Sequence, residues 1–236
     1  MNKKKTLIFT ATYNENENIS KLISLIKFYN PNVHILIIDD NSPDKTSETI
    51  FRIKKKHKNI KLIVRKKKLG LDTAHKKAFN WANRKKFDYL ITMDADLSHD
   101  PKEIKNFEKK LKEYDFVIGS RYTKGGKCLM TGFRYWISFA GNKFIKFILN
   151  SKLSEFTTSY RGFNLKKLKK FKLDFVKNSG YSFFMGTVFE IENRNFKIKE
   201  IPIIFYQRSK GKSKISKIEI FRAIINLFLN FFKKWL

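Results

Sequence analysis

Short apolar runs alternate with helical patterns along the chain as far as residue 120. The apolar runs favour strands because they are rich in β-branched and aromatic residues; they lie at residues 6–12, 33–39, 60–64, 89–93 and 116–119. Helices are predicted between them, near residues 17–29, 45–57, 72–86 and 101–113. This alternation predicts an α/β fold with right-handed crossovers and a mostly parallel sheet flanked by helices.

The pattern changes in the second half. Residues 133–149 are mostly apolar, but polar residues recur every four positions, at Arg134, Ser138, Asn142 and Lys146. That spacing predicts a helix with a single polar stripe. Further along, residues 180–206 predict a helix followed by a strand.

The C-terminal residues 216–236 also carry polar positions three or four apart, with Ile, Leu, Phe and Trp covering the rest. Their apolar sector is too wide for an ordinary surface helix, and their polar stripe makes a poor transmembrane span. We therefore expect a main domain at 1–214 and an amphipathic helix at 215–236. Alternatively, this helix and the one at 133–149 complete the core or form a dimer interface.

Composition narrows the function classes. The 236 residues are 42% hydrophobic and 15% aromatic, enough to bury a core, which argues against disorder. Lys and Arg number 51 against 21 Asp and Glu, a net charge of +30 that favours a polyanionic partner. We interpret most of the Lys as a solvated surface. Nucleic-acid binding is the alternative from a different class, and it is not expected because no recognition helix, aromatic RNA-binding motif or finger pattern occurs.

The cysteine count and the apolar segments bear on location. Cys128 is the single cysteine, so no internal disulfide or Cys-based zinc site is available, which fits a reducing compartment. The apolar stretch near the N-terminus is too short for a signal peptide, and no run of about 18 apolar residues occurs. We expect a cytoplasmic protein.

Two acidic clusters follow predicted strands. Asp94 and Asp96 come directly after residues 89–93, and two carboxylates at this spacing are suited to Mg²⁺ or Mn²⁺, which also take water and substrate phosphates as ligands. The alternative is that the pair caps the helix near residue 101.

Asp39 and Asp40 end the second strand, where α/β sheets bind ligands. An Asx turn and helix cap at the same place is compatible with that role.

Eight ordered blocks extend over nearly the whole chain and make the pattern much more specific. They are TATYNE (10–15), DDNSPDKT (39–46), GLDTAHKKAF (70–79), MDADLSHDP (93–101), GSRYTKGG (119–126), TTSYRGF (157–163), GYSFF (180–184) and EIPIIFYQRSKGKSK (200–214). In these blocks the chain resembles the family-two glycosyltransferases with the Rossmann-like GT-A fold, and within them the polyprenol-phosphate (dolichol-phosphate) mannose synthases.

The resemblance implies a role for each matching residue. Asp94 and Asp96 match the motif that binds Mg²⁺ or Mn²⁺ and the donor diphosphate, with Asp96 favoured as the direct ligand. The positions that hold the nucleotide sugar correspond to Thr12, Tyr13, Glu15, Asp40 and Ser42. Arg208 and Lys214 match a basic segment that closes over the diphosphate. The positions that grip the acceptor phosphate correspond to Arg121, Arg134, Ser138 and Arg161. Asp96, Arg121 and Arg208 are the expected catalytic residues.

The implied reaction is inverting transfer of mannose from GDP-mannose to a polyprenyl phosphate. A phosphate nucleophile is already an anion and needs no general base, which fits Gly186 at a position where many relatives carry an acid. A UDP-sugar donor such as UDP-glucose, or a saccharide hydroxyl as acceptor, are the alternatives. The lipid acceptor implies a peripheral enzyme at the cytoplasmic face of an anionic membrane, attached through 216–236 with help from 133–149.

Several positions depart from the family pattern and bear on sugar and acceptor identity. Asp72, His75, Phe79 and Phe184 differ from the usual residues, and Ser98 replaces a Gln that can assist at the metal. We expect no catalytic role for any of the four histidines, and we expect His99 to be an ordinary residue at the start of a helix.

Overall fold

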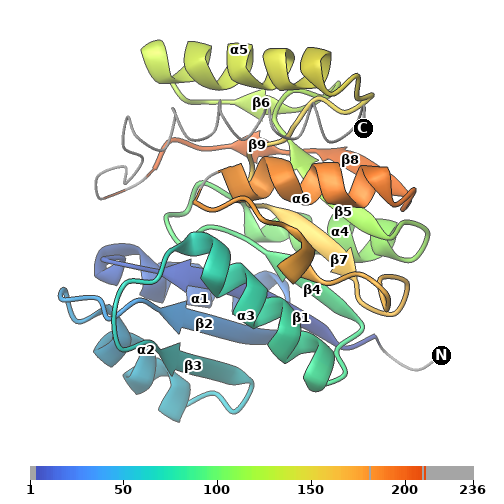
Figure 1. The fold of residues 1–236 in the computed structure, drawn as a ribbon. Helices are drawn as coiled ribbons and strands as arrows, with labels where there is room; N and C mark the ends of the chain where they lie inside the picture. Colours follow the sequence, from blue (N-terminus) through green and yellow to red (C-terminus); the bar gives the residue numbers. More distant parts are fainter. Residues whose placement is uncertain (1–3, 181, 209, 211–236) are drawn as a thin grey trace.

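A seven-stranded sheet runs through the protein in the order β3-β2-β1-β4-β7-β5-β8 (Figure 1). The computed structural model describes residues 4–180, 182–208 and 210. The strands are β1 (Thr6–Thr12), β2 (His34–Asp39), β3 (Ile60–Val64), β4 (Tyr89–Thr92), β5 (Phe116–Ser120), β7 (Arg161–Asn164) and β8 (Ile198–Pro202). Within this sheet all pairings are parallel except those of β7, which is antiparallel to both β4 and β5. The predicted α/β fold with a mostly parallel sheet is confirmed.

Helices cover both faces of the sheet (Figure 1). On one face lie α1 (Asn16–Tyr29), α2 (Thr46–Lys55) and α4 (Ile104–Leu111), and on the other lie α3 (Leu71–Arg84) and α6 (Ser182–Asn193). Helix α5 (Phe133–Ile148) lies outside these layers, next to β6 in Figure 1. A 3-10 turn, Pro101–Glu103, leads into α4. A separate two-stranded ribbon pairs β6 (Lys127–Cys128) in parallel with β9 (Ile204–Phe205).

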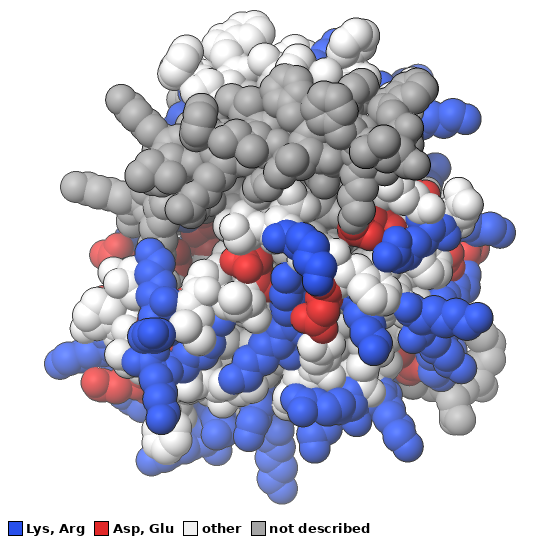
Figure 2. All heavy atoms as spheres, viewed as in Figure 1, with Lys and Arg blue, Asp and Glu red and all other residues white. Residues whose placement is uncertain are grey.

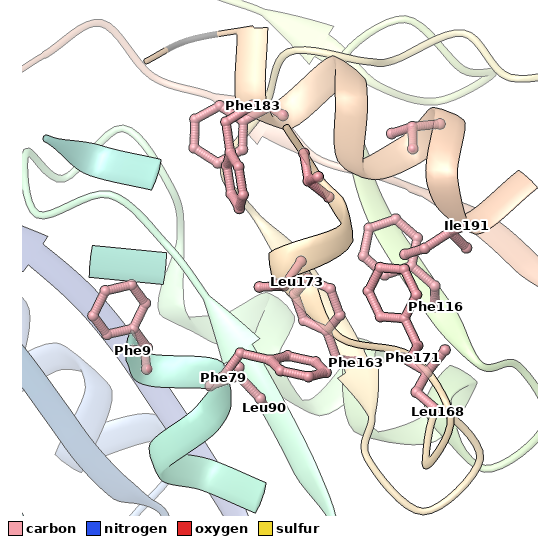
Figure 3. Packing of buried hydrophobic residues seen from close by; sticks show 14 of the residues in the cluster. Phe9, Phe79, Leu90, Phe116, Phe163, Leu168, Phe171, Leu173, Phe183 and Ile191 are labelled. Carbon is pink, nitrogen blue, oxygen red and sulfur yellow. The ribbon is translucent and has the colours of Figure 1, made fainter. Parts of the chain in front are cut away.

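Two apolar clusters form the core, one on each face of the sheet. Alternate residues of β1 divide between them: Phe9 packs with α3 and α6, whereas Ile8 packs with α1, α2 and α4. Figure 3 shows the first cluster, in which Phe79 of α3 lies beside Phe163 of β7 at a ring distance of 5.6 Å. These two layers of helix fix the strands, so the loops at the carboxyl ends of β1, β2, β4 and β5 are presented from a rigid frame.

The elements predicted from periodicity agree closely with the structure. The five predicted strands match β1 to β5, and the striped segment forms α5. Strand β7 was not predicted, because its four residues include an arginine and a glycine and show no apolar run. At Gly162 an added Cβ would lie 2.9 Å from Leu111 Cδ1, so a larger residue would have to displace the side chains of α4 that pack here.

The remaining expectations concern the C-terminus and the surface. Lys214 and the expected helix 215–236 lie outside the described residues. Among those that the structure describes, no helix is long and apolar enough to cross a bilayer. Figure 2 shows Lys and Arg widely distributed over the visible face with acidic residues between them, which agrees with a solvated basic surface.

Candidate active site

The ends of β1 and β2 are joined by the carboxylate of Asp39. Its Oδ1 accepts hydrogen bonds from the hydroxyls of Thr12, at 2.7 Å, and Ser42, at 2.6 Å. The backbone N–H of Ser42 donates to Oδ2 at 2.9 Å. Asp39 is fully buried, so it holds the two loops together. Thr12 and Ser42, which are expected to contact the nucleotide sugar, therefore lie close together because both hydroxyls bind the same oxygen of Asp39.

Asp40 points to a different set of groups. Its Oδ1 accepts from the Nε of Arg65, and its Oδ2 accepts from the backbone N–H groups of Leu69, at 3.2 Å, and Gly70, at 3.3 Å. Arg65 also donates to the hydroxyl of Thr73 at 2.6 Å. The carboxylate expected to bind the nucleotide thus also fixes the loop between β3 and α3. Sequence reasoning missed Arg65, whose only signal was its place at the end of a strand.

That loop brings a further cation to the site. The Nζ of Lys68 lies 4.4 Å from the centre of the Tyr13 ring, in the range of a cation–π contact. Tyr13, an expected nucleotide contact, follows β1, so the loops after β1 and β3 meet here. We interpreted most of the Lys as a solvated surface, and the structure places Lys68 against the candidate site instead.

Glu15 is buried and directly precedes α1. Its backbone N–H donates to the hydroxyl of Thr46 at 3.0 Å, and its Oε2 accepts from the amide of Asn18 at 2.9 Å. Its other carboxylate oxygen, Oε1, lies 3.8 Å from Nη1 of Arg208. Glu15 is therefore held toward the acidic loop, the name used here for residues 93–100 after β4.

In the acidic loop, both oxygens of Asp96 accept hydrogen bonds. Oδ1 accepts from the hydroxyl of Ser98 at 2.6 Å and from its backbone N–H at 3.1 Å. Oδ2 accepts from Nε of Arg208 at 2.9 Å and lies 2.8 Å from its Nη2. The expected metal ligand and the expected diphosphate ligand are thus in direct contact. Ser98, which the sequence analysis singled out as a departure from the family pattern, orients the carboxylate.

The two carboxyl groups of the acidic loop have opposite electrostatic environments. Desolvation and the charge of Asp96 raise the pKa of Asp94 to about 7. Burial alone would raise the pKa of Asp96 as well, but hydrogen bonds from Ser98 and the charge of Arg208 lower it below its usual value. A divalent cation relieves this kind of repulsion between carboxylates. The donor set of two carboxylates therefore fits Mg²⁺ or Mn²⁺.

The protein supplies only part of such a metal shell. Over residues 4–180, 182–208 and 210, no group of three or more His, Cys, Asp or Glu side chains is placed to hold an ion. Magnesium and manganese commonly take one or two carboxylates and complete their shell with water and substrate phosphates. The site fits a metal that is shared with a phosphorylated ligand.

Backbone pairing brings Arg208 to the acidic loop. Phe205 forms an antiparallel bridge with His99, and the N–H of Tyr206 donates to the carbonyl of Ser98 at 3.0 Å. Residues 204–208 are thereby laid along the acidic loop, although they are far from it in sequence. The expectation that Arg208 closes over this site is consistent with that placement and stays a prediction.

Arg121 follows β5 and forms a buried ion pair with Glu155. Its Nε lies 2.7 Å from Oε2 and its Nη2 lies 2.8 Å from Oε1, a two-point contact. Nη2 also donates to the hydroxyl of Thr157 at 2.7 Å. The guanidinium lies 5.1 Å from the ring centre of Phe205, which connects it to the segment that carries Arg208. Sequence reasoning missed Glu155, a lone acid in a loop with no motif signal.

Helix α5 is attached to Arg121 through polar residues of its stripe. The hydroxyl of Tyr122 donates to Ser138 at 2.8 Å, and the amide of Asn142 donates to the Thr157 hydroxyl at 3.2 Å. Arg134 is exposed in the first turn of the same helix. The structure thus brings Ser138 close to Arg121 and leaves Arg134 at the surface.

Arg161 has a different environment from the one expected. It is 1% exposed, and its guanidinium donates to three backbone carbonyls at 2.7–2.8 Å, those of Phe156, Thr158 and Phe184. These bonds join the segment before β7 to α6. We therefore assign Arg161 to the fold and do not include it among groups that hold an acceptor phosphate.

Two solved structures illustrate the fold that this chain shares. Glucosyl-3-phosphoglycerate synthase from Mycobacterium tuberculosis, in complex with Mn²⁺, UDP and glucosyl-3-phosphoglycerate, superposes with a TM-score of 0.71 at 13% identity, covering 97% of this chain and 80% of that one. A mannosyltransferase from Pyrobaculum calidifontis, in complex with GDP-Man and Mn²⁺, gives 0.62 at 14% identity, covering 99% and 64%. These likenesses show that the chain has the fold of these nucleotide-sugar-binding structures.

Sequence relatives narrow the class to a family. The chain is 32% identical over 226 residues to the polyprenol monophosphomannose synthase of Mycolicibacterium smegmatis, covering 94% of this chain and 85% of that protein. It is 30% identical over 224 residues to the undecaprenyl-phosphate mannosyltransferase of Micrococcus luteus, covering 94% and 92%. The model of glycosyl transferase family 2 matches residues 7–172. The protein belongs to glycosyl transferase family 2, and the resemblance found in its sequence is confirmed.

Proposed function

We propose that this enzyme transfers a mannosyl group from a nucleotide sugar, with GDP-mannose as the favoured donor, to a polyprenyl phosphate. The names of the two sequence relatives support both the sugar and the class of acceptor. The observation that carries the proposal is the contact between Arg208 and Asp96, because it places a guanidinium beside the carboxylates at which a donor diphosphate would bind.

The donor side is built from the loops after β1, β2 and β4. Thr12, Tyr13, Glu15, Asp40 and Ser42 line the approach to the nucleotide, and Asp94 with Asp96 would hold Mg²⁺ or Mn²⁺. When bound, the metal would supply positive charge that offsets the charge developing on the leaving diphosphate. Arg208 contributes a second positive charge from the chain itself. Lys214 is proposed for the same role.

The acceptor side relies on cations. A phosphate nucleophile is an anion near neutral pH, so it needs to be held beside the donor and needs no base to remove a proton. Arg121 is held by Glu155, and Ser138 of α5 is linked to it through the neighbouring Tyr122. We assign Arg121, Ser138 and the exposed Arg134 of the same helix to the acceptor phosphate. Gly186 agrees with this chemistry, since it offers no side chain that could act as a base; an added Cβ there would lie 2.1 Å from Asn178 Oδ1 and would displace that side chain.

A membrane surface is the proposed location of the acceptor. Helix α5 exposes large apolar side chains, including Phe133 at 80%, Trp136 at 62% and Phe147 at 80%. Lys143 and Lys146 lie on the same helix. Aromatic side chains interspersed with lysines suit the interface of an anionic bilayer. We propose peripheral attachment at the cytoplasmic face through α5, with residues 215–236 as a second attachment.

Flotation with liposomes tests the attachment. The double variant Phe133→Ser and Phe147→Ser is expected to float less with anionic vesicles than the unchanged protein. Phe28 is 77% exposed on α1, so Phe28→Ser is a matched control that should float normally. Equal flotation of the double variant and the control would contradict a role for α5.

Incubation with a panel of nucleotide sugars tests the reaction. The purified protein, polyprenyl phosphate and Mg²⁺ or Mn²⁺ are combined, and the mass of the lipid product is measured. The expected product is mannosyl phosphoryl polyprenol formed from GDP-mannose. If a lipid product formed with UDP-glucose and not with GDP-mannose, the proposed donor would be wrong. If a glycosylated saccharide formed without the lipid, the proposed acceptor would be wrong.

A further inference from the structure

His99 lies in the acidic loop but is not at its surface. The residue is 1% exposed and its ring packs against Tyr160, at a centroid distance of 4.8 Å, and Phe205, at 5.3 Å. It precedes the 3-10 turn and does not begin a helix, which corrects the expectation from sequence. A histidine buried so close to two carboxylates needs a physical reason.

The two ring nitrogens contact two different segments. Nδ1 lies 3.1 Å from the backbone nitrogen of Asp94, and Nε2 lies 3.3 Å from the hydroxyl of Thr158. A backbone N–H can only donate, so Nδ1 accepts and the proton of the neutral ring is on Nε2. The imidazole is therefore fixed at both nitrogens, between the acidic loop and the segment before β7.

The acidic loop requires such support. Leu97 adopts a φ of 66°, a left-handed conformation that is unfavourable for a residue with a branched side chain. Ser98 holds the carboxylate of Asp96 on one side of Leu97, and His99 holds the backbone of Asp94. The backbone of His99 also bridges to Phe205, three residues before Arg208.

We propose that His99 is a positioning residue that sets the backbone of Asp94, so that both carboxylates of the acidic loop meet the metal and donor in the required geometry. This inference rests on the proposed function, because it takes Asp94 and Asp96 as the metal site. Hydrogen bonds that orient metal ligands commonly change metal affinity or activity by about 10- to 100-fold when they are removed.

Three substitutions separate the two contacts of the ring. His99→Asn places an acceptor close to where Nδ1 lies and can keep the bond to Asp94. His99→Gln reaches farther, toward the place of Nε2, and can keep the contact with Thr158. His99→Phe preserves an aromatic ring and loses both contacts. His57→Phe is the matched control, since His57 lies after α2, outside the site.

Binding of Mn²⁺ in the presence of GDP, followed by electron paramagnetic resonance on the full chain, is the readout. We expect His99→Phe and His99→Gln to weaken Mn²⁺ binding by about tenfold or more, and His99→Asn to remain within about threefold of the unchanged protein. The apparent KM for the donor should rise in the same order, while the KM for polyprenyl phosphate changes little.

The outcomes distinguish the inference from the function beneath it. Equal Mn²⁺ affinity for the Asn and Gln variants would overturn the role of His99, even if the Phe variant does not fold. If Asp96→Ala bound Mn²⁺ as tightly as the unchanged protein, the proposed metal site itself would be wrong. The metal site and the role of His99 are both supported if Asp96→Ala loses Mn²⁺ binding and His99→Asn binds Mn²⁺ more tightly than His99→Gln.

Discussion

Arg208 contacts a single oxygen of Asp96 with two of its nitrogens, Nε at 2.9 Å and Nη2 at 2.8 Å. That oxygen, Oδ2, is the one that Ser98 leaves open, since Ser98 binds Oδ1. A metal ion arriving alone would therefore compete with the guanidinium for Oδ2. A donor diphosphate offers Arg208 a different anionic partner.

Replacing Arg208 should consequently change metal binding in opposite directions with and without nucleotide. Two unit charges about 4 Å apart interact by about 4 kcal/mol at an effective dielectric constant of about 20. If the metal ion gains a third of that energy when Arg208 is removed, its affinity rises about tenfold. We expect Arg208→Gln to bind Mn²⁺ alone about tenfold more tightly and to bind GDP with Mn²⁺ more weakly. Calorimetric titration measures both.

Lys58→Gln is the control for this prediction, because it removes an exposed positive charge between α2 and β3, outside the site. It should leave both affinities nearly unchanged. A lower affinity of Arg208→Gln for Mn²⁺ alone would contradict competition at Oδ2.

Removal of the Asp96 carboxylate should abolish most of the activity. Asp96→Ala deletes both the proposed metal ligand and the partner of Arg208, and one preorganised charged contact is worth about 3 kcal/mol in the transition state. We expect turnover to fall by about 10²-fold or more in a radiolabelled sugar transfer assay. Glu17→Ala, an exposed acid on α1, should retain full turnover, and near-normal turnover of Asp96→Ala would remove that residue from the mechanism.

The buried pair of Arg121 and Glu155 should contribute strongly to stability. Glu155 is fully buried and Arg121 is 7% exposed, so Glu155→Gln leaves an uncompensated buried cation. Breaking such a pair costs about 3–5 kcal/mol. Urea denaturation should show a loss of this size in the free energy of unfolding.

An exposed pair provides the comparison. Glu48 lies 3.8 Å from Arg52 on α2, and both side chains are more than half exposed. Glu48→Gln should change the free energy of unfolding by less than about 1 kcal/mol. Similar effects of the two substitutions would mean that burial does not determine the strength of the inner pair.

His75 should make the protein sensitive to acid. The residue is packed among aromatic rings, with Phe9 at 4.9 Å and Phe184 at 5.1 Å, and burial followed by the charge of Arg161 lowers its pKa from 6.5 to about 3. Between these two values the unfolded chain binds a proton that the folded chain does not. The free energy of unfolding therefore falls as the pH drops below 6.5.

The expected size can be measured by urea denaturation at two pH values. Between pH 7 and pH 5 the His75 contribution is about 2 kcal/mol, since one unit of pKa corresponds to about 1.4 kcal/mol. His75→Phe should lose about that much less stability over this interval than the unchanged protein. His57→Phe serves as control, and an identical pH dependence for His75→Phe and the unchanged protein would refute the prediction.

The sequence was sufficient for elements that depend on local periodicity. Strands β1 to β5 and helix α5 were predicted because each carries a repeating apolar pattern that packing preserves. The acidic loop was found because two carboxylates after a strand are an unusual local arrangement. Strand β7 carries no such pattern, since its position depends on pairing with β4 and β5.

Polar residues whose role depends on distant partners could not be assigned from sequence. Arginine is a common phosphate ligand, so the sequence alone suggested that role for Arg161. Its structural role became visible only when the fold showed three backbone carbonyls around its guanidinium. Glu155 and His99 have no local signal either. Their roles follow from Arg121 and Asp94, which the fold brings to them from other loops.

Strands β5 and β7 are antiparallel neighbours, with Ile118 opposite Arg161, so the chain leaves the sheet after Ser120 and returns to it at Arg161 beside the point of departure. Residues 121–160, which include α5 and Glu155, form one segment whose two ends lie next to each other in the sheet. Such a segment can be lengthened or exchanged while the strand order around it stays the same. The segment assigned to the acceptor phosphate can therefore vary in length while the strands that carry the donor site keep their order.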